Sequence, residues 1–255
     1  MVTISIANQK GGVGKTTTSI SLGNALAEMG KKVLLVDIDP QASLTISCGI
    51  DPASVEGKSI YEVLVDGLDP KEILIQKGNL VVLPATIHLA AAELQLINQV
   101  SRETFLKDVL EGFPDYDYIV IDCPPTLGLL TLNALTASDQ IIIPVAAEFL
   151  AFMGLKLLMD TITKVQAKLN KNLEIGGVIA TMYQPTTRNS QEVFGELKKF
   201  FKLKSEKGLL FDYPINKSIR FAEAPIDGLN IFEYAADIPG AQAYRNIAKE
   251  LIKNE

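Results

Sequence analysis

The sequence contains two cysteines, one histidine, no tryptophan and no long apolar run. Cys48 and Cys123 are too few for a disulfide framework and lack the spacing of a zinc or iron–sulfur site, which favours a reducing compartment. The longest apolar runs, such as residues 141–147, fall far short of the ~20 residues of a membrane-spanning helix. The N-terminus does not resemble a signal peptide. We therefore expect a soluble cytoplasmic protein with no membrane association.

The composition also excludes a disordered chain. Hydrophobic residues occupy 47% of the 255 positions and charged residues 21%, so the chain can bury a substantial core. No linker or repeat interrupts it, and we predict a single domain over residues 1–255. The net charge is −6 but unevenly distributed: residues 1–155 carry 9 Lys and Arg against 18 Asp and Glu, whereas residues 156–220 carry 12 against 6.

Short β-rich apolar runs alternate with helical patterns along the whole chain, which is typical of βαβ units. The predicted strands are residues 2–7, 32–37, 80–84, 118–122, 140–145 and 175–182. The predicted helices are residues 16–29, 59–65, 90–96, 102–111, 128–137, 149–169, 190–200 and 241–254. Because the strands are almost continuously apolar, we predict a doubly wound α/β fold whose mostly parallel sheet has helices on both faces.

A glycine-rich loop, KGGVGKTT at residues 10–17, follows the first predicted strand and opens the first predicted helix. In this position consecutive backbone N–H groups and a helix N-terminus bind a phosphate chain. We expect Lys15 to reach the terminal phosphates of ATP and the Thr16 hydroxyl to ligate Mg²⁺. The residues expected to bind the nucleotide here are Lys10, Gly11, Gly12, Val13, Gly14, Lys15, Thr16 and Thr17.

Two further predicted strands lead into aspartates. Asp37 ends one strand and Asp39 follows it before a proline, while Asp122 ends another. Ligands of open α/β sheets bind at the carboxyl ends of the strands, so we expect these carboxylates at one site. An apolar strand ending in aspartate is the Walker B pattern, whose carboxylate holds Mg²⁺ directly or through water. The metal-site residues that these patterns predict are Thr16 and Asp122.

The phosphate loop departs from the common spacing at one end. Gln9 stands where the first glycine is expected, and Lys10 lies inside the loop. This loop resembles the deviant Walker A motif of the ParA/MinD family of P-loop ATPases. The resemblance implies that Lys10 crosses a dimer interface to the partner's ATP, that Asp39 positions the attacking water and that Asp37 supports the Mg²⁺ site. The implied catalytic residues are Lys10, Lys15 and Asp39.

Downstream segments resemble the short, Soj-like ParA proteins in particular. The matching segments are residues 144–155, 181–183 and 220–225. The resemblance implies that Met182, Pro214 and Asn216 bind the adenine end of the nucleotide. No helix-turn-helix segment precedes the first strand, so we expect any DNA contact to come from the ATPase domain itself.

The resemblance implies a slow, Mg²⁺-dependent ATPase that segregates chromosomal or plasmid DNA. In such a cycle ATP closes a homodimer, the dimer binds double-stranded DNA without sequence preference, and a ParB-like partner triggers hydrolysis and release, which places the protein on the nucleoid. A basic surface of this kind contacts phosphates rather than bases. The candidate DNA-binding residues are Lys199, Lys202, Lys217, Arg220 and Arg188.

Other functions stay open from the sequence. A ParA-like ATPase can position a protein cargo on the nucleoid, and a MinD-like one works on a membrane. A metal-cluster carrier with the same ATP engine is disfavoured because the cysteines lack cluster spacing. A nonenzymatic nucleotide-binding module is disfavoured because Lys15, Asp39 and Asp122 are all present.

Overall fold

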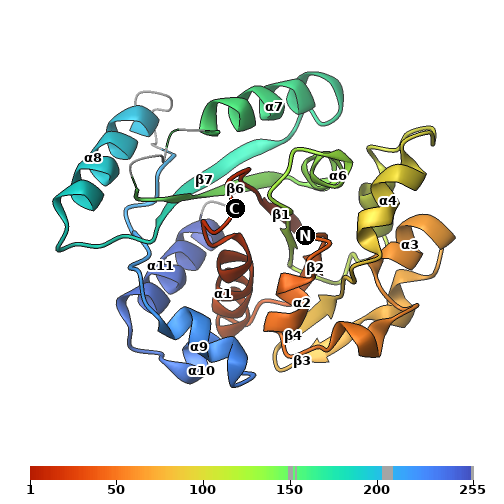
Figure 1. Ribbon diagram of the computed structural model, residues 1–255, viewed down its shortest axis with the longest axis horizontal. Coiled ribbons are helices and arrows are strands. Elements are labelled where there is room, and N and C mark those ends of the chain that lie inside the picture. Colours follow the sequence, from red (N-terminus) through yellow and green to blue (C-terminus); the bar gives the residue numbers. More distant parts are fainter. Residues whose placement is uncertain (149–151, 153, 203–208, 254–255) are drawn as a thin grey trace.

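Seven strands form one sheet in the computed structural model, which describes residues 1–148, 152, 154–202 and 209–253 (Figure 1). The strand order is β3-β4-β2-β5-β1-β6-β7, and every neighbouring pair is parallel except β3 with β4. The strands are β1 (Val2–Ile6), β2 (Val33–Asp37), β3 (Ile75–Lys77), β4 (Leu80–Leu83), β5 (Tyr118–Asp122), β6 (Gln140–Ala146) and β7 (Glu174–Thr181). The predicted mostly parallel sheet is confirmed.

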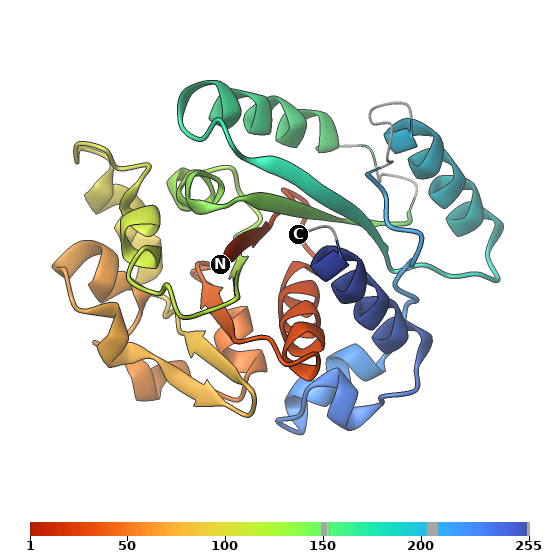
Figure 2. The same cartoon turned by 180° about the vertical axis from the view of Figure 1, so that it is seen from behind.

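Helices cover both faces of this sheet, as Figures 1 and 2 show from opposite sides. One face carries α1 (Lys15–Glu28), α2 (Ser43–Ser47), α9 (Arg220–Ile226), α10 (Ile231–Tyr234) and α11 (Pro239–Lys253). The other carries α3 (Ile60–Asp66), α4 (Leu89–Leu96), α5 (Phe105–Leu110), α6 (Leu129–Ala137), α7 (Leu155–Lys168) and α8 (Arg188–Lys202). Two 3-10 helices, η1 (Pro52–Val55) and η2 (Pro70–Ile73), lie in the connections. No helix within the described residues is long and apolar enough to cross a membrane.

The side chains of β5 show why the strands are apolar throughout. Tyr118 and Val120 belong to the core beneath α1 and α11, whereas Ile119 and Ile121 belong to the core on the opposite face. Successive side chains of a strand point to opposite faces, so a strand covered on both sides buries every residue. Each fully buried side chain of this size contributes about 1.5–3 kcal/mol to folding.

All six predicted strands are present, each end within one residue of its prediction. The sequence pattern does not predict β3, a three-residue edge strand that pairs antiparallel with β4. It also does not predict α2, α9 or α10, which are 4 to 7 residues long. Such segments are too short to display a helical period, and Pro225 inside α9 obscures it further.

Two predicted helix starts are wrong. The helix predicted over residues 149–169 begins at Leu155, because Gly154 has a left-handed φ of +84°, which is not a right-handed helical conformation. Residues 149–151 and 153 of that prediction lie outside the described part of the chain. The helix predicted from residue 102 begins at Phe105, since Ser101 has a φ of 57° and a turn follows it.

The carboxyl ends of β1, β5 and β2 lie side by side and define where a ligand can bind. The strand register pairs Asp122 with Ile6 on one side and with Asp37 on the other. The phosphate loop follows β1, and Asp39 lies in the loop that follows β2. The predicted meeting of these segments at one edge is therefore a direct result of the strand order.

Candidate functional site

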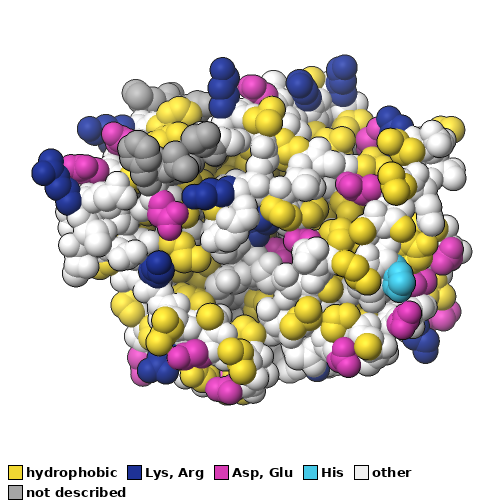
Figure 3. Space-filling view, viewed as in Figure 1, with side chains coloured by type: hydrophobic (Ala, Val, Ile, Leu, Met, Phe, Trp, Pro, Cys, Tyr) yellow, Lys and Arg dark blue, Asp and Glu magenta, His cyan; other side chains and the backbone are white. Residues whose placement is uncertain are grey.

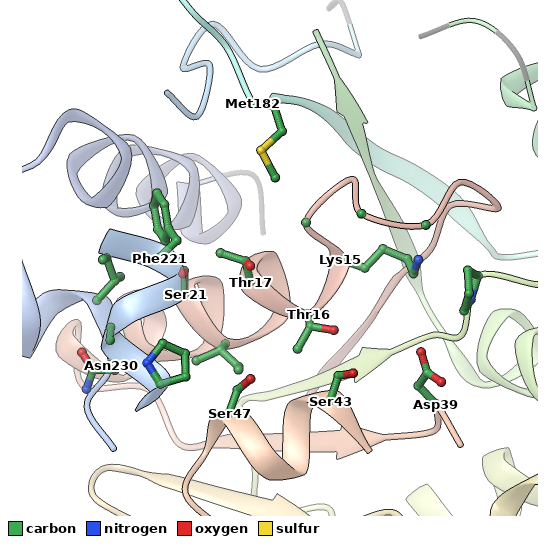
Figure 4. Close-up of a pocket in the computed structure, with 18 of the residues that line it drawn as sticks. Lys15, Thr16, Thr17, Ser21, Asp39, Ser43, Ser47, Met182, Phe221 and Asn230 are labelled. Carbon is green, nitrogen blue, oxygen red and sulfur yellow. The ribbon is translucent and has the colours of Figure 1, made fainter. Parts of the chain in front are cut away.

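A cavity of about 410 Å³ opens at this edge of the sheet, which is the size of a small-molecule site (Figure 4). In the close-up Lys15 and Asp39 lie at one end, and Phe221 and Asn230 at the other. The lining comes from the phosphate loop, α1, the loop after β2, α2 and α9–α10. Its residues are Gly11, Gly12, Gly14, Lys15, Thr16, Thr17, Ile20, Ser21, Asp39, Ser43, Ser47, Pro125, Met182, Phe221, Ala224, Pro225, Leu229, Asn230 and Ile231.

Gly12 and Gly14 give the phosphate loop its shape. Their φ angles are +74° and +84°, in the left-handed region that favours glycine. Gly14 caps α1, so the first helical turn lines the cavity together with the glycines. A helix N-terminus preceded by a glycine-rich loop attracts anions through its unpaired N–H groups and its dipole.

Side chains from neighbouring strands hold this loop in place. The Asn8 amide donates to the Pro144 carbonyl at 2.7 Å, and its oxygen accepts from the Lys10 N–H at 3.0 Å. The Thr181 hydroxyl donates to the Val13 carbonyl at 2.8 Å. Val13 itself is buried and does not line the cavity, so its predicted nucleotide contact stays a prediction for the backbone.

Lys15 is a buried cation at the phosphate end of the cavity. Burial lowers the pKa of its ammonium, while the nearby carboxylates of Asp122 and Asp39 raise it. Its Nζ donates to the Lys10 carbonyl at 3.5 Å. A desolvated ammonium gains more from a phosphate than a solvated one, so this position suits the predicted contact.

Asp122 is fully buried at the end of the central strand. Its Oδ2 accepts from the Thr16 hydroxyl at 2.7 Å, and its Oδ1 from the Ser19 hydroxyl at 2.9 Å. Burial raises the pKa of Asp122 to about 7, and the adjacent Asp37 carboxylate raises it as well, whereas the two hydroxyls and Lys15 lower it. A carboxylate in this state is destabilised until a cation compensates its charge.

Asp37 and Asp39 shape the loop that follows β2. The Asp37 carboxylate accepts from the N–H of Asp39 at 3.1 Å and from the N–H and hydroxyl of Thr45 at 2.9 and 2.7 Å. Burial raises its pKa to about 6. Asp37 does not line the cavity, so its predicted Mg²⁺ role stays a prediction, whereas Asp39 lines it beside Lys15. Ala42, three residues after Asp39, has a strained φ of 51°.

Lys10 does not line the cavity but forms an ion pair with Glu148, Nζ to Oε2 at 3.4 Å. Glu148 follows β6, so the pair links the phosphate loop to the segment before α7. The Lys10 side chain is 36% exposed and that of Glu148 52%, and an ion pair in contact with solvent contributes at most about 1 kcal/mol. The pair therefore costs little to break.

Met182 and α9 form the other end of the cavity. Met182 has a left-handed φ of 51° and points into the cavity, opposite Phe221. Pro214 and Asn216 do not line it, because this stretch pairs with Tyr183 on the outer edge of the sheet. Their predicted contact with the base stays a prediction, and Phe221 and Asn230 occupy the corresponding end of the cavity instead.

The candidate DNA-binding residues are exposed and come from three segments. Lys199 and Lys202 lie on the last turn of α8, and Lys217 precedes α9; within the described residues none of the three has an ion pair with an acidic side chain. Arg188 pairs with Glu192 and Arg220 with Glu223. Arg188 stands at the opposite end of α8 from Lys202, about 20 Å away along the helix.

The oxygen donors at the cavity fit Mg²⁺. Thr16 lines it and is hydrogen-bonded to the Asp122 carboxylate, which has no basic side chain in hydrogen-bond contact within the described residues. Hydroxyl, carboxylate and phosphate oxygens are the ligands that this hard cation prefers. Among the described residues, no group of three or more His, Cys, Asp or Glu side chains is placed to hold a metal ion. Asp122 is fully buried behind Thr16 and does not itself line the cavity, so its predicted contact with Mg²⁺ stays a prediction.

Several residues of the site were not predicted, among them Ser19, Glu148 and Thr45. Ser19 lies one turn after Thr16 on the same face of α1, and that spacing could have indicated it. Glu148 lies in a segment that resembles the Soj-like ParA proteins, but its pairing with Lys10 arises because β1 and β6 are neighbours in the sheet. No local signal indicates Thr45, whose contact with Asp37 forms only when α2 folds back onto β2.

Comparison with known proteins identifies relatives along the whole chain. The family model described as an AAA domain matches residues 1–175. The chain is 48% identical over 254 residues to the sporulation initiation inhibitor protein Soj of Bacillus subtilis, covering 98% of each protein. It is 39% identical over 257 residues to the chromosome partitioning protein ParA of Caulobacter vibrioides, covering 99% of this chain and 94% of that protein.

A solved structure shares the fold with a nucleotide bound. The structure described as cobyrinic acid a,c-diamide synthase from Mycobacterium smegmatis, with an ATP analogue and magnesium, has a TM-score of 0.86 and 37% identity. The alignment covers 100% of this chain and 95% of that one. The P-loop NTPase fold predicted from the sequence is thereby confirmed.

Asp122→Asn tests whether this carboxylate is kept for a ligand rather than for stability. Because the folded-state pKa of Asp122 is raised above its unfolded value near 4, the wild-type free energy of unfolding falls as pH rises from about 4 to about 7. We expect the ligand-free variant to be more stable at pH 8 by on the order of 1 kcal/mol, with the gain shrinking toward pH 4. Urea unfolding at several pH values measures this, and the exposed Asp66→Asn is the control. The assignment is contradicted if the free energy of unfolding of the variant, relative to that of wild type, is lower at pH 8 than at pH 4.

Proposed function

The chain belongs to the Soj/ParA family of P-loop ATPases, and we propose that it segregates chromosomal or plasmid DNA. The observation that carries the proposal is the 48% identity with Soj over 98% of both chains, together with a cavity lined by the phosphate loop and Asp39, where Thr16 bonds the buried Asp122. Identity with the diamide synthase structure is lower, at 37%, so the partitioning relatives guide the proposal.

ATP hydrolysis at this cavity depends on positioning and charge compensation. The glycine loop and the N-terminus of α1 would hold the phosphate chain, Lys15 would contact its terminal phosphates, and Asp39 would orient the attacking water. Thr16 and Asp122 would hold Mg²⁺, which when bound neutralises charge on the phosphates. When bound, Mg²⁺ would also compensate the negative charge of the buried Asp122 carboxylate, and the removal of that desolvation cost would favour the loaded site.

Dimer formation would use Lys10. Its solvent-exposed pair with Glu148 is weak, and a triphosphate of a second subunit offers a stronger acceptor. ATP thereby becomes the group that joins two copies of the chain across their phosphate loops. Hydrolysis and release of phosphate remove that acceptor, and Lys10 returns to Glu148.

DNA binding would follow from dimer formation. Lys199, Lys202 and Lys217 supply cations for backbone phosphates, but the monomer carries a net charge of −6. Two copies joined by ATP present these three lysines twice, so once one copy has bound DNA, the second contact is favoured by a high effective concentration. A ParB-like partner that stimulates hydrolysis would then release the protein from DNA. This cycle places the protein in the cytoplasm on the nucleoid.

Lys10→Ala should prevent ATP-dependent dimer formation. The variant keeps the cavity but loses the cation that reaches the second nucleotide, so we expect a monomer on a sizing column with Mg²⁺ and a nonhydrolysable ATP analogue. Glu148→Ala is the matched control, because it breaks the same ion pair and leaves Lys10 free; it should still dimerise. A dimer formed by Lys10→Ala rejects the role of Lys10.

Asp39→Ala should trap the ATP-bound dimer. Loss of the residue that orients water should lower single-turnover hydrolysis at least about tenfold while leaving ATP binding within a few-fold of wild type. Quenched-flow measurement of phosphate, combined with nucleotide binding, separates these effects. Asp66→Ala, at an exposed position of α3, should hydrolyse ATP at the wild-type rate. Normal turnover in Asp39→Ala rejects its assignment.

Charge reversal tests the DNA surface. Changing Lys199, Lys202, Lys217 and Arg220 to Glu should reduce ATP-dependent retention of nonspecific double-stranded DNA at least about tenfold at low salt. Reversing four exposed lysines elsewhere, Lys32, Lys58, Lys71 and Lys107, matches the change in net charge and should leave more binding intact. Equal loss in both variants attributes binding to net charge and removes the patch from the mechanism.

A further inference from the structure

A second cavity, of about 610 Å³, opens at the end of the sheet opposite the nucleotide cavity. Val33 begins β2 and lines this cavity, as do Asn79 and Val81 around the start of β4 and residues 112–116, which lead into β5. Because β2 and β5 begin beside this cavity and end toward the nucleotide cavity, the length of a five-residue strand, on the order of 15 Å, separates the two. A volume of this size is typical of a small-molecule site.

The walls of this second cavity are largely apolar. Val33 and Phe113 are buried, and Leu74, Val81 and Tyr116 are half-buried. The rings of Phe113 and Tyr116 pack edge to face, with their centroids 6.1 Å apart and their planes at 76°. Aromatic rings favour further rings in edge-to-face or offset contact. An apolar ligand that contains a ring would therefore leave water on entering this cavity.

Two lysines also line the cavity. Lys32 lies at the start of β2 and Lys71 in η2, and both are exposed. Within the residues that the structure describes, neither ammonium forms an ion pair with an acidic side chain. Asp115 lines the cavity as well, whereas Asp117, which accepts from the Lys32 N–H at 2.8 Å, lies outside the lining. Two unpaired ammonium groups beside an apolar cavity favour a ligand that carries an anionic group.

Exposed apolar side chains alone do not make such a site. Figure 3 shows hydrophobic side chains interspersed with acidic ones over the side of the molecule where Figure 1 draws α3 and α4. Leu94 on α4 is exposed there, as single apolar residues are on every soluble protein. A cavity surrounds a ligand and removes most of its surface from water, which an isolated side chain cannot do.

We propose that this second cavity binds a small organic anion whose apolar part contains an aromatic ring. The ring would pack against Phe113 and Tyr116, and its acidic group would contact Lys32 and Lys71. Among the described residues, the linings of the two cavities share no member, so this ligand and ATP would bind independently. The site goes beyond the proposed function and requires neither DNA nor a second subunit.

The test measures binding of anilinonaphthalene sulfonate to the full chain by its fluorescence, because this probe joins aromatic rings to one anionic group. Wild type should bind it saturably, and ADP with Mg²⁺ should leave the affinity unchanged. Changing Lys32 and Lys71 together to Glu should weaken binding at least about tenfold, since two favourable charges become repulsive. The matched control changes Lys58 and Lys164 to Glu, two exposed lysines outside the cavity, and should bind the probe as wild type does.

A second variant tests the apolar wall. Leu74→Asp places a carboxylate among the lining residues, so it should also weaken probe binding at least about tenfold, with thermal unfolding as the check that the variant is folded. Equal binding by wild type and by the variant with both Lys32 and Lys71 changed rejects the proposal. So does equal binding of the neutral sulfonamide of the same probe. Displacement of the probe by ADP assigns it to the nucleotide cavity and rejects the proposal as well.

Discussion

The buried carboxylate of Asp122 is the group on which the arrangement of the site depends. It ends the central strand of the sheet, beside Asp37, and the only polar groups that contact it directly within the described residues are the hydroxyls of Thr16 and Ser19. A carboxylate without a paired cation in this position is unfavourable, which is why its pKa rises to about 7. The two hydroxyls come from successive turns of α1, so the same contacts fix the helix whose N-terminus meets the phosphates. The contacts of the buried Asp122 carboxylate therefore also position the helix N-terminus that attracts anions.

The same logic extends to the loops around the cavity. The Asp37 carboxylate accepts from the N–H of Asp39 and so holds the turn in which Asp39 lies. Ala42, three residues after Asp39, has a strained φ. Lys15 is buried with a lowered pKa, and Met182 points into the cavity from a left-handed backbone. Each of these features is costly in the ligand-free chain, by about 1–3 kcal/mol for a strained residue. A nucleotide with its metal compensates the charges, and the surrounding fold sustains the strain.

The features that could be predicted from the sequence are those that depend on residues close together in the chain. The strands were predicted because two-sided burial makes each of them apolar, and the phosphate loop because its glycines and Lys15 stand between a strand and a helix. Contacts between segments far apart in the chain were not predictable, such as Thr45 with Asp37 or Lys10 with Glu148. Short elements also escaped, because α9 and α10 have too few residues to display a period. They form the end of the cavity that was assigned to other residues.

The uneven charge of the chain has a structural meaning once the fold is known. The acidic portion contains the phosphate loop, both aspartate-bearing strands and α4, and the basic portion contains α8 and the approach to α9. Under the proposed function, DNA phosphates would therefore contact Lys199 and Lys202, away from the acidic portion of the chain. The nucleotide cavity is lined by residues of both portions, with Asp39 from the acidic one and Met182 from the basic one, so a bound nucleotide would contact both.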